Sequence, residues 1–198
     1  MSFKTTYSTD KKAVLEVRSA QDNSVKVELP AFLSSFTDSF ASSWSEEQVY
    51  GRIDPIGTFQ GTKRSIQIGI DIIGYDIADA KSNLKKINTL TRMLYPSYAK
   101  VAQAEGPNAL VLSKSPLVEL KFGNLIQDQS GKDKFLLGWF SSFSANPVLE
   151  MGMFTDKVGE FLPKVHNVSM SFTPQHRGDL GFNSTSKTKT KFPYDGGS

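Results

Sequence analysis

Alternating apolar and polar residues run through most of the chain and predict a mainly β protein. Residues 12–18 and 25–29 alternate on either side of the turn cluster SAQDNS, which is typical of a hairpin. Further strands are expected later in the chain, over residues 108–113, 116–123, 134–144 and 160–173. The pattern therefore favours antiparallel strands joined by short polar turns.

The longest alternating segment, residues 58–75, changes character halfway along. Its even positions run from Thr58, Gln60, Thr62 and Arg64 to isoleucines at 66, 68, 70 and 72. One face of this strand is therefore expected to be wet, that is exposed to solvent, in its first half and dry, that is buried, in its second. A strand of 18 residues would extend about 60 Å. We expect it to bend near Gly61 or to leave the domain and meet another chain.

Two neighbouring segments give weaker patterns. Residues 48–54 predict a strand that ends at Pro55, because proline cannot donate to a sheet ladder. Residues 30–45 are rich in serine and carry an aromatic residue at every fourth position: Phe32, Phe36, Phe40 and Trp44. That spacing favours one face of a helix, so a loop or short helix is expected there.

A single amphipathic helix is predicted over residues 76–94. Apolar residues recur at intervals of three and four, at Ile77, Ala80, Leu84, Ile87, Leu90 and Leu94. Asp76 is suited to cap the first turn, and Pro96 biases Tyr95 out of the helical conformation. One dry stripe predicts a helix that packs on one face of a sheet.

Composition excludes several classes of site. The chain has 198 residues and no cysteine, so disulfides, thiolate metal sites and cysteine nucleophiles are absent. Its net charge is +3, of which three lysines and one aspartate in residues 184–198 supply +2. The predicted domains are therefore a nearly neutral β domain over residues 1–183 and a flexible basic tail over residues 184–198. Such a distribution lacks the clustered basic face that phosphate binding requires.

Candidate chemistry is sparse. His166 and His176 are the two histidines, and their spacing matches no metal motif. His166 shares its alternation with Val168 and Met170 and is interpreted as a structural residue at the core edge. Phosphate-binding and nucleophile-elbow motifs are missing. We therefore expect no enzymatic activity, no catalytic or metal-binding residues and no cofactor.

The segment VYGRIDPIGTFQGTKRSIQIGIDI, residues 49–72, resembles a known family. It is similar to the tail-tube-like proteins that join baseplate and tail tube in contractile-tailed phages. The shared positions are Tyr50, Arg52, Asp54, Phe59, Gln60, Gly61, Thr62 and Arg64. The helix ending in LYP (94–96) and later segments at 115–126, 138–144 and 161–182 follow the same order.

This resemblance implies a two-sheet antiparallel β-sandwich or barrel with one flanking helix. It further implies a homo-hexameric ring at the tube–baseplate junction of the virion, made in the host cytoplasm. The ring would template tube assembly and contact tail-tube and baseplate hub or wedge proteins. Phage DNA would pass through it non-specifically. The chain itself is expected to bind no membrane. The eight shared residues would lie at subunit interfaces. Lys63, Lys121 and Lys134 are expected to point away from the channel or to pair with acids.

Three alternatives remain open at this point. The main tail tube subunit belongs to the same class of virion protein and differs only in stacking indefinitely. A monomeric β-barrel enzyme or ligand-binding protein would instead show a ligand pocket. A binder of single-stranded nucleic acid would show salt-dependent affinity for DNA.

Overall fold

The computed structural model describes residues 14–30, 33–100, 110–129, 134–178, 180–181 and 192–194. Its strands are β1 (Val14–Ser19), β2 (Lys26–Pro30), β3 (Leu33–Glu47), β4 (Ile56–Ile73), β5 (Ser97–Lys100), β6 (Leu110–Lys114), β7 (Val118–Lys121), β8 (Leu136–Pro147), β9 (Met153–Thr155), β10 (Phe161–Pro163) and β11 (Val165–Pro174). The helix α2 spans Ile77–Arg92, and a 3-10 turn spans Leu149–Met151. The predicted mainly-β fold with one α-helix is confirmed.

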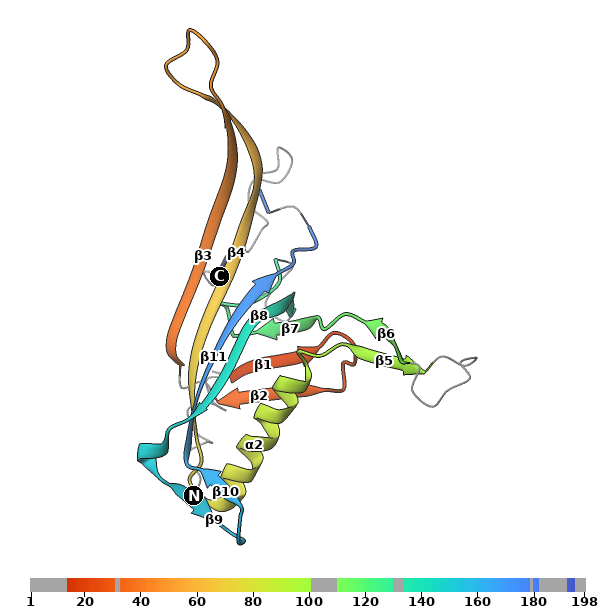
Figure 1. Cartoon of the computed structure of the whole chain (residues 1–198), viewed down its shortest axis with the longest axis vertical. Coiled ribbons are helices and arrows are strands. Elements are labelled where there is room, and N and C mark those ends of the chain that lie inside the picture. The colour runs from red at the N-terminus through yellow and green to blue at the C-terminus, as the bar shows by residue number, and fades with distance from the viewer. Residues whose placement is uncertain are drawn as a thin grey trace.

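One seven-stranded antiparallel sheet forms most of the molecule, in the order β2-β1-β7-β8-β11-β4-β3. The strands β3, β4, β8 and β11 run close to the long axis, whereas β1, β2 and β7 run across it (Figure 1). The sheet is therefore strongly twisted, and its two ends supply the two β layers around the core. Two small two-stranded sheets, β9–β10 and β5–β6, complete the described strands.

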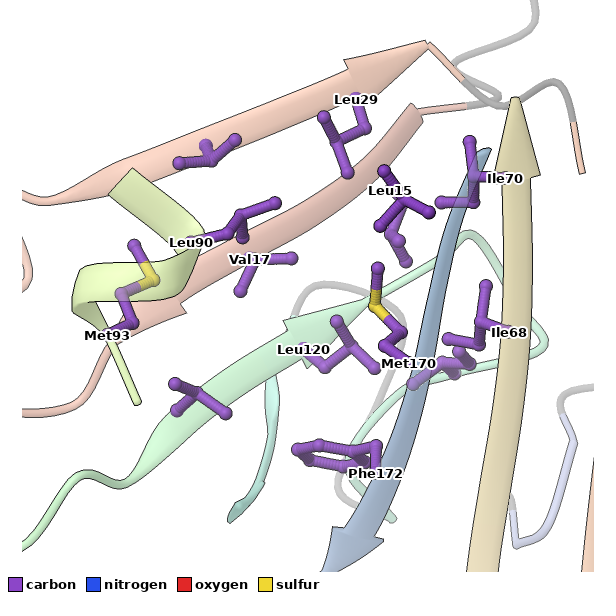
Figure 2. Packing of buried hydrophobic residues seen from close by; sticks show 14 of the residues in the cluster. Leu15, Val17, Leu29, Ile68, Ile70, Leu90, Met93, Leu120, Met170 and Phe172 are labelled. Atoms are coloured by element: carbon purple, nitrogen blue, oxygen red, sulfur yellow. The ribbon is translucent and has the colours of Figure 1, made fainter. Parts of the chain in front are cut away.

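The hydrophobic core lies between the two ends of the sheet and α2. Leu15, Val17 and Leu29 from β1 and β2 and their neighbour Leu120 from β7 form one cluster with Ile68, Ile70, Met170 and Phe172 from β4 and β11 (Figure 2). Leu90 and Met93 close the side covered by α2. The dry half of β4 is thus confirmed, because Ile66, Ile68, Ile70 and Ile72 are all at most 2% exposed.

Local signals fix the helix as expected. Asp76 accepts a hydrogen bond from the backbone N–H of Asp79 through Oδ1 at 2.6 Å, which satisfies an orphan donor of the first turn. Asn83 on α2 is buried and donates to the backbone oxygen of Ile73 at the end of β4. The helix is therefore anchored to the strand that precedes it.

Two predictions of secondary structure are wrong. Residues 33–47 form strand β3 rather than a loop or short helix. A spacing of four is also an even spacing, so Phe36, Phe40 and Trp44 share one face of a strand as readily as one face of a helix. Residues 48–55 form the turn between β3 and β4 rather than a strand. Phe32 and most of the predicted tail lie outside the described residues.

Candidate assembly interface

The β3–β4 hairpin extends well beyond the rest of the sheet (Figure 1). We call residues 39–63 the arm. Within the arm every residue is exposed except Gly61, which is half-buried, whereas from Arg64 onward the even positions of β4 are buried. The strand therefore leaves the body of the domain, and its contact with another chain stays a prediction.

The strand β3 of the arm forms one edge of the described sheet. β3 is the last strand of the sheet, and in the described part of the chain only β4 pairs with it. Its 15 residues contain no proline and no lysine, two of the residue types that natural proteins use to block exposed edges. This edge can accept another strand.

An apolar stripe runs along the arm on the same face as the core. We give this name to Phe40, Trp44 and Phe59, whose side chains are 44%, 56% and 53% exposed. Trp44 pairs with Phe59 across the hairpin, and their ring centroids are 5.2 Å apart in an edge-to-face arrangement. The core face of the sheet thus continues into solvent as an uncovered aromatic surface.

A β-bulge in β4 makes this continuity possible. Ser43 pairs with Gly61 and Trp44 pairs with Phe59, so Gln60 has no opposite residue in β3. The extra residue shifts the alternation, so the core face carries Thr62 before the bulge and Phe59 beyond it. The bulge lies directly next to Gly61, where the sequence predicted a bend. The prediction of a wet first half is wrong beyond the bulge, since strict alternation was counted through Gln60.

The opposite face of the sheet is polar and nearly free of charge. We call it the serine face, and its members on β3, β4, β8 and β11 include Ser35, Thr37, Ser39, Ser65, Gln67, Ser142, Ser144, Ser169 and Ser171. Many of these side chains bond across strands, as in the 2.8 Å hydrogen bond between the hydroxyls of Ser144 and Ser169. Such bonds leave a smooth surface of small neutral groups.

Charged residues lie mostly at the margins of the serine face. Asp71 is on it and accepts a hydrogen bond from Asn167 Nδ2 at 2.8 Å. Lys63 is exposed on the same side of the arm, opposite Ala41. Lys134 lies elsewhere, in a shallow hollow that Asp128 and Glu119 also line. Lys63 and Lys134 therefore lie in different surroundings.

The turn at the tip of the arm holds three of the predicted interface residues: Tyr50, Arg52 and Asp54. All three are exposed, and Tyr50 is fully so. Gln48 Nε2 donates to the backbone oxygen of Arg52 at 3.1 Å, which closes the turn. In this described turn, Arg52 and Asp54 form no ion pair with each other. The tip therefore presents free side chains rather than an internally paired loop.

Arg64 lies just outside the arm, at its root where the hairpin joins the body of the sheet, and faces inward. Its Nη2 lies 2.7 Å from Asp38 Oδ2, and both side chains are only 2% exposed. Its Nε also donates to Asp38 Oδ1 at 2.9 Å. The sequence pattern pointed to Arg64 but not to Asp38. Asp38 lies on the same face of β3 as Phe36 and Phe40, so it could have been found once β3 was recognised as a strand.

Other possible sites were sought in the described part of the chain. It contains no group of three or more His, Asp or Glu side chains arranged to hold a metal ion. None of its helices is long and apolar enough to cross a membrane. Comparisons with known protein families and with curated proteins found no match to this chain.

Proposed function

We propose that the protein is a virion structural subunit that forms a ring at the junction of a phage tail tube and its baseplate. The observation that carries this proposal is the arm, which combines an unpaired edge strand with an exposed apolar stripe. Both features are unfavourable on an isolated molecule and are removed when a neighbouring copy covers them.

The arm suggests how copies associate. The β3 edge of one copy would pair with a strand of the next, and the apolar stripe would pack on the neighbour's sheet. Such contacts join two different surfaces, so they are head-to-tail and close into a ring when the rotation allows it. The number six comes from the resemblance to tail-tube-like proteins.

The serine face suggests the lining of the channel. Neutral hydroxyl groups offer no fixed charge to phosphates, so DNA would pass along them without binding strongly. With this face inward, Lys63 lies on the channel side and departs from the expectation that it points away. One such lysine in each copy would give a limited positive ring near the arm.

A main tail tube subunit is the nearest alternative. The same arm and serine face would serve it equally well, and only the extent of stacking distinguishes the two functions. Rings that stack into long tubes in solution would favour the tube subunit, whereas single rings would favour the junction.

A ligand-binding protein is the alternative from another class. A cavity of about 470 Å³ opens between the β1–β2 turn and the end of α2, with Asp22, Arg92 and Tyr95 in its lining. A protein that stays monomeric and binds a small molecule there would support this alternative instead.

Assembly can be tested with the full-length chain and two variants. We expect mass photometry and negative-stain images to show rings for the wild type. Replacing Trp44 and Phe59 with serine removes two of the three rings of the apolar stripe and should leave monomers. A control, Val158→Ser, changes a fully exposed residue in the turn between β9 and β10 and should still form rings.

Localisation covers the case of a subunit that assembles only on its hub. In phage particles that contain the chain, immunogold labelling should place it at the end of the tube next to the baseplate. Labelling confined to another part of the particle, or a purified monomer that neither joins particles nor forms rings, would overturn the proposal.

A further inference from the structure

The segment Phe192–Tyr194 lies against the root of the arm, far from it in sequence. The Phe192 ring meets Phe40 edge-to-face at a centroid distance of 6.0 Å and meets His176 in the same way at 5.2 Å. The Tyr194 hydroxyl donates a hydrogen bond to Asp38 Oδ2 at 2.8 Å. An apolar contact and a polar contact thus hold the segment at two points.

The surface beneath the segment has the features of a built site. Arg64 and Asp38 supply a buried ion pair, and the Arg64 guanidinium lies between two rings, 5.3 Å from the centroid of Phe40 and 5.4 Å from that of Phe192. His176 adds a third wall from the chain after β11. Three separate parts of the chain therefore converge on the segment.

The site is incompletely satisfied when the segment is seated. Arg64 Nη1 and both ring nitrogens of His176 are buried without a hydrogen-bond partner in the described part of the chain. Buried polar atoms without partners oppose the docked state, because they lose water and gain no bond in exchange. Tyr194 itself remains 41% exposed. These features favour a contact that can open.

We propose that Asp38, Phe40, Arg64 and His176 form a peptide-docking site, and that Phe192–Tyr194 of the same chain occupies it reversibly. The aromatic wall recognises the phenylalanine, and the Asp38 carboxylate recognises the tyrosine hydroxyl. The docked segment shields the Arg64–Asp38 pair from water and covers part of Phe40, the first residue of the apolar stripe, which stays 44% exposed. Its release uncovers that end of the stripe and admits water to the ion pair.

Hydrogen exchange on the full-length protein tests the docked contact. The double variant Phe192→Ala/Tyr194→Phe should exchange the backbone amides of residues 37–41 and 63–66 about fivefold faster or more, because the root of the arm loses its cover. A matched double variant, Phe161→Ala/Tyr98→Phe, removes an exposed ring and a hydroxyl elsewhere and should behave as the wild type. Equal exchange in all three proteins would overturn the proposal.

The single variant Tyr194→Phe guards against a general loss of folding. It removes one hydroxyl from a partly exposed ring, so the fold should be retained and only the amides near Asp38 should exchange faster. Faster exchange spread evenly over β1 and β2 would instead indicate global destabilisation and contradict a local docking site.

Binding in trans tests the recognition directly. A fluorescein-labelled peptide of residues 184–198 should bind the full-length Phe192→Ala/Tyr194→Ala variant saturably in fluorescence anisotropy. It should bind the wild type less tightly, because the chain's own segment competes for the site. The same peptide with both aromatic residues changed to alanine should not bind. Absence of binding by the natural peptide, or equal binding by both peptides, would refute the assignment.

Discussion

The core-side face of the β3–β4 hairpin is buried in the half next to the core and exposed in the arm. Next to the core, Ile66, Ile68 and Ile70 are covered by β1, β2 and β7. In the arm, Phe40, Trp44 and Phe59 continue that face with nothing described above them except the docked segment at Phe40. The exposed stripe is thus entirely aromatic, whereas the covered half of β4 is aliphatic and is joined by Phe36 of β3, which packs against the core.

This difference separates residues that stabilise the subunit from residues available to a partner. An isoleucine face next to other strands packs densely and favours a unique fold. Aromatic side chains supply a large contact area at little conformational cost and are enriched at protein interfaces. One hairpin can therefore serve the core at its root and a partner at its end.

The largest expected effect comes from matched phenylalanines in the two regions. Phe172 is fully buried in the core, so Phe172→Ala should lower the free energy of unfolding by about 3–5 kcal/mol. Phe59 is half-exposed in the arm, so Phe59→Ala should cost less than about 1 kcal/mol in the monomer. Urea denaturation of both variants measures the difference, and equal losses would contradict the division between core and arm.

A smaller effect is expected at the boundary, where Asp38 meets Arg64. Asp38→Leu leaves a buried guanidinium unpaired and should cost about 2–3 kcal/mol, below the value for a deep interior because water can enter once the docked segment lifts. The double variant Asp38→Leu/Arg64→Met removes both charges and should recover much of this loss. A double-mutant cycle by urea denaturation would disprove the pairing if the two substitutions were additive.

The smallest effect is a dependence on pH that originates outside the arm, which contains no histidine. Burial lowers the pKa of His166. Burial, followed by the charge of Arg64, lowers the pKa of His176, while Asp128 and Asp38 partly oppose this shift. The folded chain therefore holds both rings neutral, and protonation favours the unfolded chain.

Stability should thus be fully present above the ordinary histidine pKa of 6.5 and should fall as the pH drops from there toward the lower folded values. Urea midpoints measured from about pH 8 to about pH 5 would follow this fall. The variant His166→Gln/His176→Gln should show a shallower fall over the same range. An unchanged slope would mean that other groups control the response.

Much of the fold could be predicted from local patterns. The β1–β2 hairpin, the long β4 strand and the capped helix α2 each depend on residues close together in the chain. The isoleucines of β4 show their period of two directly, and Asp76 lies where a helix start needs an acceptor. Such signals do not depend on how distant strands pair.

The parts that were missed depend on pairing. In β3, alternation is obscured because serine occupies both faces, and aromatic residues at every fourth position fit either type of element. Asp38 meets Arg64 only through the register of two strands, 26 residues apart. The contact of Tyr194 with Asp38 spans 156 residues and has no sequence signal. Register and long-range docking were therefore beyond what local periodicity can show.

A single residue without a partner in β3, Gln60, determines which face of the arm is apolar and which is polar. If the strands paired through it without a bulge, Gln60 would lie opposite Trp44 and Phe59 opposite Ser45, so that Phe59 would point to the serine face. The core would be unaffected, because its own pairing begins beyond that point. The orientation of the arm's exposed surface thus depends on how one residue is accommodated in the ladder, independently of the core that carries the arm.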